Sequence, residues 1–286
     1  MSDYTALFLG QKPTGEAAWR TLQRLNDGSI EIAAIATNTS PADVWWGSAE
    51  IYDTAGSEIP IIGSTERNNH QLLEIIENKG VDLILCVHHP WILPGSILEA
   101  VDYNAVTIHN APLPEDKGYN TVNHAILNGD DQFSSSALWM AEEVDSGDLI
   151  YEGTFSIESD ETAISLYIKA HYAAIAIFGQ VITDLIADRP LPAKSMTKEG
   201  TFYPRESIEG LRQIEAPDSL ELKQKSRAFF FPPFEPAYVQ YGTNRYHVVP
   251  DGAYDKLTAS NGTADRLFDV LLEKYRSVSI QIQDRT

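Results

Sequence analysis

The sequence holds a single cysteine, Cys86, in 286 residues. One thiol excludes a disulfide framework within the chain, and such sparse cysteine is typical of proteins in a reducing cytoplasm, where we expect this one to work. Cys86 lies inside the apolar run 82–87. A cysteine in that setting usually packs as a small hydrophobic residue, so we do not expect it to be a nucleophile.

Long hydrophobic runs are also missing. The longest candidate, 173–178, is far too short to cross a bilayer. The N-terminus carries no basic segment ahead of an apolar one, so we expect no secretion signal. Together these observations predict a protein without a membrane partner.

Positive charge is scarce, with 21 Lys and Arg against 41 Asp and Glu. The imbalance is uneven, because the net charge is −19 over residues 1–200 and −1 over 201–286. A strongly acidic surface repels polyanions, so we expect no nucleic acid as a partner. A small anionic ligand stays compatible with this surface, provided that a few local cations face it.

The first 110 residues alternate between short apolar runs, typical of buried strands, and segments of helical periodicity. This alternation predicts an α/β fold with a Rossmann-like, mostly parallel sheet and helices on both of its faces. The predicted strands are 4–9, 30–37, 59–62, 82–87 and 105–109, and the predicted helices are 16–26, 44–54, 69–79 and a short one from Pro94.

Beyond residue 110 the order of elements changes. A helix over 120–127 precedes two strands, 133–140 and 149–157, and a long helix over 161–187 follows them. The composition then shifts, which indicates a domain boundary. We divide the chain into a catalytic domain over 1–190, a linker over 191–200, and a small α+β appendage over 201–286 that includes a hairpin of 237–241 and 245–249.

Two side chains at predicted loop tips form a candidate catalytic pair. His109 closes the strand 105–109, and Asp145 lies in a Ser-Gly turn between two strands. Ligands of parallel α/β sheets bind beyond the carboxyl ends of the strands, and a histidine beside a carboxylate suits proton transfer at a reacting carbonyl. His88 and His89 also follow a strand. Neighbouring side chains on extended backbone point opposite ways and no further ligands complete a set, so we expect no metal.

Three segments resemble the motifs of one enzyme family. The run 108–114 reads Ile-His-Asn-Ala-Pro-Leu-Pro and is followed by Lys117-Gly118, a helix over 123–130 ends in Leu-Asn-Gly, and 143–150 contains Asp-Ser-Gly-Asp-Leu-Ile. In order and spacing they resemble the folate-dependent formyltransferases. The resemblance covers residues 3–190 and implies the same Rossmann-like fold.

The resemblance implies an enzyme that transfers a formyl group from 10-formyltetrahydrofolate to a substrate amine. Such a reaction needs a donor for the negative charge that develops on the formyl oxygen, and a path for the amine proton. The resemblance assigns these roles to His109 and Asp145. It places the pterin against the backbone of two segments, whose candidate residues are Cys86, His88, His89, Pro90, Trp91, Ile92, Leu93, Glu142 and Val144.

One catalytic position departs from the family pattern. The family carries an asparagine two residues before the catalytic histidine, where this chain has Thr107. Asparagine offers an NH₂ donor to the formyl oxygen, whereas threonine offers only a shorter hydroxyl, and loss of such a donor costs on the order of 10²–10³ in rate. Either Thr107 takes over the catalytic role, or the protein is a catalytically weak binder of folate or nucleotide. A third alternative is hydrolysis of the formyl donor.

Further resemblance implies the acceptor. The segments 89–93, 117–120 and 229–236 resemble the nucleotide-sugar N-formyltransferases, which act on dTDP- or GDP-linked aminodeoxy sugars used in surface polysaccharide such as lipopolysaccharide O-antigen. The C-terminal part is too short and too acidic for the tRNA-binding domain of methionyl-tRNA formyltransferases, and the phosphate turn of the glycinamide ribonucleotide enzymes is absent. The candidate substrate-binding residues are Lys12, Asn110, Lys117, Tyr119, Asn120, Arg205, Arg227 and Tyr238.

Residues 201–286 combine nearly neutral charge with clustered aromatic side chains. A monomer rarely exposes so large an apolar surface, and contact through this region avoids repulsion between the acidic N-terminal parts. We therefore expect some of the aromatic rings to close the nucleotide site, and the rest to form the contact of a two-fold homodimer joined through this region. The aromatic residues are Phe229, Phe230, Phe231, Phe234, Tyr238 and Tyr241.

Overall fold

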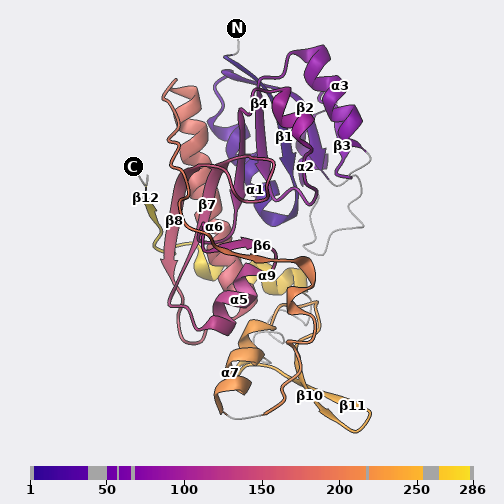
Figure 1. Cartoon of the computed structure of the whole chain (residues 1–286), viewed down its shortest axis with the longest axis vertical. Helices are drawn as coiled ribbons and strands as arrows, with labels where there is room; N and C mark the ends of the chain where they lie inside the picture. The colour runs from indigo at the N-terminus through magenta and orange to yellow at the C-terminus, as the bar shows by residue number, and fades with distance from the viewer. Residues whose placement is uncertain are drawn as a thin grey trace.

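The structure, a computed structural model, describes residues 3–37, 50–56, 58–65, 68–216, 219–253 and 264–283. Its centre is an eight-stranded sheet in the order β12-β8-β7-β5-β4-β1-β2-β3 (Figure 1). The strands are β1 (Tyr4–Gly10), β2 (Ile30–Thr37), β3 (Ile61–Gly63), β4 (Leu83–Val87), β5 (Ala105–His109), β7 (Gln132–Trp139), β8 (Leu149–Ser156) and β12 (Gln281–Gln283). The strands from β5 to β3 run parallel, and β7, β8 and β12 are antiparallel additions.

Helices cover both faces of this sheet, which confirms the predicted α/β class. They are α1 (Lys12–Leu25), α2 (Glu50–Thr54), α3 (Asn69–Lys79), α4 (Gly95–Glu99), α5 (Thr121–Asn128) and α6 (Ala163–Ile186). On one face, Phe8 of β1 packs against Trp19 of α1 and Phe178 of α6, with ring centroids 5.3 and 6.4 Å apart. On the other face, Ile76 of α3 and Ile97 of α4 lie in a separate buried cluster.

The first helix begins earlier than the sequence pattern predicts. A helix over 16–26 was expected, but α1 already begins at Lys12. Pro13 lies in its first turn, where a missing N–H is harmless, and Gly15 packs so closely that a Cβ there would lie 2.9 Å from the Gly10 carbonyl carbon. The early start places Lys12 beside the carboxyl end of β1. Of the predicted helix over 44–54, residues 44–49 lie outside the described residues.

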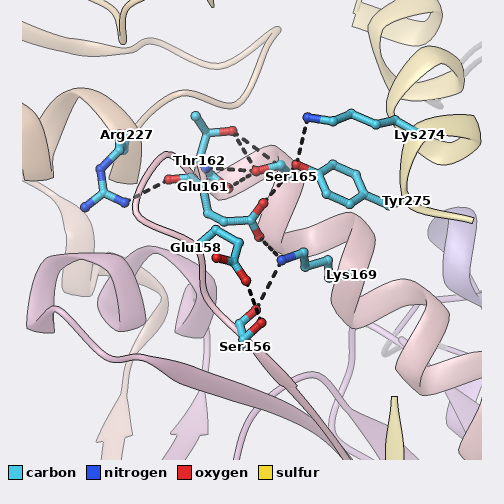
Figure 2. Close-up of polar contacts among 9 residues, drawn as sticks. All are labelled: Ser156, Glu158, Glu161, Thr162, Ser165, Lys169, Arg227, Lys274 and Tyr275. Carbon is cyan, nitrogen blue, oxygen red and sulfur yellow. Dashed lines mark hydrogen bonds and ion pairs between the residues drawn. The ribbon is translucent and has the colours of Figure 1, made fainter. Parts of the chain in front are cut away.

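The long helix α6 runs through the core. It begins with a capping box, in which the Ser165 N–H donates to Thr162 Oγ1 and the Thr162 N–H donates to Ser165 Oγ (Figure 2). By length and composition alone it is apolar enough to cross a membrane, contrary to the sequence expectation that no segment is. In the structure 67% of its most apolar window is buried inside the protein. Packing in the core therefore accounts for its hydropathy.

After residue 200 the chain leaves the sheet and later returns to it (Figure 1). The elements of this part are β9 (Thr201–Tyr203), the 3-10 helix η3 (Arg205–Ile208), α7 (Ser219–Ala228), β10 (Ala237–Tyr241), β11 (Asn244–Val248) and α9 (Ala264–Tyr275), and the short strand β6 (Asp116–Gly118) comes earlier in the chain. β9 pairs with β6, and β10 and β11 form a projecting hairpin. Tyr172 Oη of α6 donates to the Leu272 carbonyl of α9 at 2.6 Å, and β12 pairs with β8. The division at 191–200 stays a prediction, qualified by this return of 264–283 to the catalytic part.

The aromatic cluster expected at a dimer surface is only partly exposed. Phe229 and Phe230 are each 2% exposed and belong to the core, whereas Phe234 and Tyr241 are 54% and 77% exposed. The exposed apolar surface is therefore smaller than the sequence indicates, because the end of α7 covers the start of α6, where the Ile164 N–H donates to the Phe230 carbonyl.

Candidate active site

His109 and Asp145 come together at the carboxyl end of β5. His109 is the last residue of β5, and Asp145 lies in the turn between β7 and β8. Nε2 of His109 lies 3.6 Å from Oδ2 of Asp145, and the two side chains are 16% and 13% exposed. Catalytic contacts are often this long before a substrate binds. The pair is therefore close enough to work together and open enough to reach a ligand.

The short strand β6 holds both members of the pair. The Gly118 N–H donates to Asp145 Oδ2 at 2.9 Å, and Nε2 of His109 lies 3.3 Å from the carbonyl oxygen of Asp116. Both oxygens that face Nε2 are acceptors, so this nitrogen carries a proton. β6 thus sets the tautomer of the histidine and the direction of the carboxylate.

The turn that carries Asp145 has a backbone that few residues tolerate. Asp145 lies in the left-handed region at φ 52°. A Cβ on Gly147 would overlap the Trp139 carbonyl oxygen, at a distance of 1.9 Å. Glycine is therefore required at 147, and a strained residue held in place by its surroundings is typical of functional sites. Three other predicted site residues share this backbone region, namely Lys12, His88 and Asn120, at φ 60°, 60° and 58°.

Thr107 lies beside Cys86 in the register of β4 and β5, and its side chain hydrogen-bonds the Cys86 thiol. Burial raises the pKa of Cys86 to about 11, so the thiol stays protonated at neutral pH. This agrees with the view that Cys86 is a packing residue and not a nucleophile. Thr107 shares a face of β5 with His109, two residues on. Its catalytic role stays a prediction.

Replacing Thr107 by asparagine is expected to retain or raise kcat, because it restores the NH₂ donor that the family presents to the formyl oxygen. The side chain grows by about one heavy atom, which a half-buried position tolerates. Steady-state kcat measures the effect, and Thr107→Val is the control that keeps the shape and removes the hydroxyl. A folded asparagine variant with a sharply lower kcat would show that Thr107 has another role, such as supporting Cys86.

The two segments expected to hold the pterin lie side by side. Tyr103 Oη donates to Glu142 Oε1 at 3.0 Å, and a Cβ on Gly95 would lie 3.2 Å from the same oxygen. In the loop before Gly95, the apolar side chains of Trp91 and Ile92 are 41% and 62% exposed. Exposed apolar side chains beside loop backbone suit a pterin, which is a flat ring with amide-like hydrogen-bonding groups at its edge.

His89 adds an unused polar atom to this loop. Burial lowers the pKa of its ring to about 4, so the ring is neutral. Nδ1 lies 3.4 Å from Ser64 Oγ, while the buried Nε2 has no hydrogen-bond partner among the residues that the structure describes. Buried polar atoms are nearly always paired, so this orphaned atom fits a loop that completes its hydrogen bonds with a ligand. The residues present therefore fit a folate head group, and their roles as its ligands stay a prediction.

Four of the predicted substrate-binding residues gather in one place: Lys12, Tyr119, Asn120 and Arg205. The Arg205 guanidinium lies 5.0 Å from the centre of the Tyr119 ring, and Asn120 Nδ2 donates to the Arg205 carbonyl at 2.9 Å. Desolvation by the surrounding protein, and then the positive charge of Arg205, lower the pKa of Lys12 below its ordinary value. Two neighbouring cations in a protein of net charge −20 form a local site for an anion.

The remaining predicted substrate residues are placed differently. Lys117 lies on β6. Nη1 of Arg227 donates to the Glu161 carbonyl at 3.0 Å, and the buried Tyr238 ring lies 4.3 Å beneath the guanidinium of Arg245. In the described part of the chain, no contact joins Arg227 or Tyr238 to the two-cation group, and their roles in substrate binding stay a prediction.

Asp116 is a site residue that sequence reasoning missed. Its carbonyl faces His109, and its own side chain is only 7% exposed. Burial, and then the neighbouring Asp130, raise the pKa of this carboxyl group to about 6. The sequence places Asp116 between the Leu-Pro and Lys-Gly motifs, but it does not reveal which carbonyl turns toward the histidine.

Asp116→Asn is expected to stabilise the protein at about pH 8 and to have little effect at about pH 4. The folded pKa of about 6 exceeds the ordinary value of 3.8. Between these values the folded state binds more protons than the unfolded state, so stability falls as the pH rises through this window and stays lower above it. Urea unfolding across this range checks the prediction. A wild-type-to-variant difference that is constant with pH would contradict it.

Comparison with known proteins places this site in a family. The family model described as Formyl transferase matches residues 10–182. A GDP-perosamine N-formyltransferase of Brucella melitensis is 28% identical over 190 residues, which are 66% of this chain and 73% of that protein. A solved 4-N formyltransferase from Francisella tularensis has a TM-score of 0.72 at 18% identity, covering 88% of this chain and 99% of that one. For an N-formyltransferase from Helicobacter canadensis the TM-score is 0.65 at 18% identity, covering 86% of each chain. The two structures show the shared fold, and since the family model spans more than half of the sequence, this chain belongs to the formyl transferase family.

Proposed function

We propose that this protein transfers the formyl group of 10-formyltetrahydrofolate to the amino group of a nucleotide-linked aminodeoxy sugar. The observation that carries the proposal is the His109–Asp145 pair, 3.6 Å apart and partly open, in a chain of the formyl transferase family. The substrate class rests on relatives. One is named a GDP-perosamine N-formyltransferase, and another was solved in complex with folinic acid and dTDP-3-aminofucose.

The catalytic pair supplies a donor that is already oriented. 10-Formyltetrahydrofolate provides the formyl group when bound. Nε2–H of His109 meets the Asp116 carbonyl at 3.3 Å, which is long for a hydrogen bond, so this proton is available to stabilise negative charge on the formyl oxygen. Asp145, held by Gly118, faces the same nitrogen and keeps the ring in place. Little reorganisation is then needed during the transfer.

Lys12 and Arg205 give the nucleotide part a place to bind. Lys12 is the first residue of the 14-residue helix α1, whose N-terminal N–H groups also attract anions. The guanidinium of Arg205 is suited to bidentate contact with phosphate oxygens. A pyrophosphate held here would leave the attached amino sugar near the strand ends, where His109 lies.

The same proposal places the reaction in the cytoplasm, with the formylated sugar used in surface polysaccharide such as O-antigen. The single buried thiol supports a reducing location. A cytoplasmic pool of nucleotide sugars would then be the source of the acceptor.

Tetrahydrofolate release, followed by absorbance, tests the proposal with and without a panel of dTDP- and GDP-linked amino sugars. Release that depends on the amine supports it, and the matched hydroxy sugars are the control. Equal release without amine indicates a hydrolase. Binding of folate or nucleotide without release indicates the catalytically weak protein that Thr107 suggests.

We also propose a two-fold homodimer joined through the hairpin of β10 and β11. Val239, Tyr241 and Tyr246 share one face of this hairpin by register, and the two tyrosines are 77% and 55% exposed. Light scattering at micromolar concentration and moderate salt is expected to give the mass of two chains. Tyr241→Ser with Tyr246→Ser should give one chain, while Gln240→Ser on the other face should not. A wild-type mass of one chain, unchanged by nucleotide, would contradict the dimer.

A further inference from the structure

His88 and Asn110 hold two buried nitrogen atoms without partners. His88 follows β4, and Asn110 follows the neighbouring strand β5. Neither His88 Nδ1 nor Asn110 Nδ2 makes a hydrogen bond of ordinary geometry, although the Asn110 side chain interacts with the His88 ring. Asn110 is 8% exposed, and the substrate contact expected from the sequence stays a prediction. Buried polar atoms are nearly always paired, so the pair calls for an explanation.

If the side-chain oxygen and nitrogen of Asn110 exchange places, the two unpaired nitrogen atoms are accounted for. Ser135 Oγ lies 2.9 Å from the amide oxygen and 2.8 Å from the Ala170 carbonyl, and its single hydrogen serves only one of these acceptors. With the amide reversed, Asn110 Nδ2 donates to Ser135 Oγ, and Ser135 donates to Ala170. The Asn110 oxygen then accepts from Nδ1–H of His88. Amide oxygen and nitrogen are assigned from their partners, and this orientation gives Asn110 Nδ2 an acceptor and turns the amide oxygen toward the His88 ring.

This chain of hydrogen bonds fixes the tautomer of His88. Because Nδ1 carries the proton, Nε2 presents a lone pair, and no described residue hydrogen-bonds it. The side chain is half-buried, so a small ligand group is able to reach it. Burial, and then Lys12, hold the pKa of His88 well below its ordinary value, which keeps the ring neutral at neutral pH, so that the Nε2 lone pair is not already protonated. The titratable groups that face the ring are Lys12 from α1, His109 from β5, and Tyr167 and His171 from α6.

We propose that Nε2 of His88 accepts the proton that the substrate amine loses, an assignment that rests on the function proposed above. The transfer forms a bond from the amine nitrogen to the formyl carbon and breaks the bond from that carbon to N10 of the folate. One proton passes from the amine to N10, and nothing is oxidised or reduced. The Nε2 hydrogen of His109 faces the Asp116 carbonyl in this structure and is assigned above to the formyl oxygen, so His109 serves as the donor. His88, just after the neighbouring strand β4, offers a lone pair, so donor and acceptor are separate residues.

The tautomer is tested without any substrate by nitrogen-15 NMR of the ligand-free protein with labelled histidine. We expect a neutral His88 ring with its proton on Nδ1 at about pH 7, the ordinary pKa of histidine being about 6.5. Its signals are assigned by their loss in His88→Gln. Asn110→Leu is expected to remove the tautomer preference. A charged ring, or a proton on Nε2 in the wild type, overturns the proposal.

The role is tested by pH–rate profiles of formyl transfer. His88→Gln is expected to lower kcat by about 10²-fold or more with little change in KM for the sugar. Asn110→Asp places a carboxylate on Nδ1, which favours the charged ring and moves the acidic limb of kcat/KM to higher pH. A purely structural role would not move that limb. His70→Gln, at a side chain 82% exposed on α3, is the matched control and should behave like wild type.

The outcomes separate this proposal from the function on which it rests. If wild type shows amine-dependent release, but His88→Gln keeps its kcat and Asn110→Asp keeps its acidic limb, the His88 assignment fails and the function stands. If wild type releases no tetrahydrofolate with any amine, the function fails and the His88 assignment fails with it.

Discussion

Replacing His109 by alanine is expected to lower kcat by about 10²–10⁴-fold while the protein stays folded. The imidazole supplies the Nε2 donor at the end of β5, and alanine leaves the formyl oxygen without it. The side chain is 16% exposed and its contacts with Asp145 and the Asp116 carbonyl are polar, so its truncation leaves the apolar core unchanged. Thermal unfolding of the variant should therefore stay close to that of wild type.

Asp145→Asn is expected to have an effect of the same order for a different reason. Oδ2 of Asp145 accepts from the Gly118 N–H at 2.9 Å and also faces the Nε2–H of His109. An asparagine oxygen at the Oδ2 position keeps both contacts but carries no negative charge, and an NH₂ group at that position would meet two donors. The histidine loses the carboxylate that orients it, although the backbone turn is unchanged.

Tetrahydrofolate release and thermal unfolding, measured on the same samples, check both variants. Asp148→Asn removes a carboxylate from the same turn without touching the pair and is expected to keep a rate near that of wild type. If His109→Ala or Asp145→Asn kept more than about a tenth of the wild-type rate, well short of the usual loss for such groups, the assignment of the catalytic pair would be wrong.

The central strands could be predicted because a strand buried on both faces is a local apolar run. The run 105–109 is β5 with the same bounds, and 82–87 contains β4. Elements without such a run were missed. β12 consists of three exposed residues, Gln281–Gln283, and it exists only because it pairs with β8. β6 and β9 are three residues each and hold each other across 85 positions of sequence, as the pairing of Asp116 with Thr201 shows.

The catalytic pair could be predicted, but most of its supports could not. His109 and Asp145 lie in motifs that keep their spacing along the chain. The Asp116 carbonyl, by contrast, turns toward the histidine only in the folded loop, and the contact of Asn110 with Ser135 joins residues 25 positions apart. A run of phenylalanines in the sequence does not indicate which rings are buried. The burial of Phe229 and Phe230 follows from the packing of α7 on α6, which only the folded structure shows.

Lys169→Met is expected to destabilise the protein by about 3–5 kcal/mol, which is typical of breaking a buried ion pair from one side. Lys169 Nζ lies 2.9 Å from Glu161 Oε2, and the side chains are 5% and 1% exposed. The ammonium also donates to the Ser156 carbonyl at 3.1 Å (Figure 2). Methionine fills a similar volume but leaves the Glu161 carboxylate inside the protein without its cation.

The double variant Lys169→Met with Glu161→Gln separates charge from packing, because it leaves no buried charge behind. It should recover much of the lost stability, since replacing both members of a buried pair is often nearly neutral. Burial, and then the Glu161 carboxylate, raise the pKa of Tyr275 above its ordinary value, so its hydroxyl stays protonated and donates to Glu161 Oε1 at 2.8 Å. A glutamine oxygen preserves this bond, which ties α9 to the start of α6 (Figure 2). Urea unfolding of both variants measures the difference, and limited proteolysis reports whether α9 loosens in the single variant. Equal destabilisation of the two would show that lost packing, and not an uncompensated charge, sets the stability of this cluster.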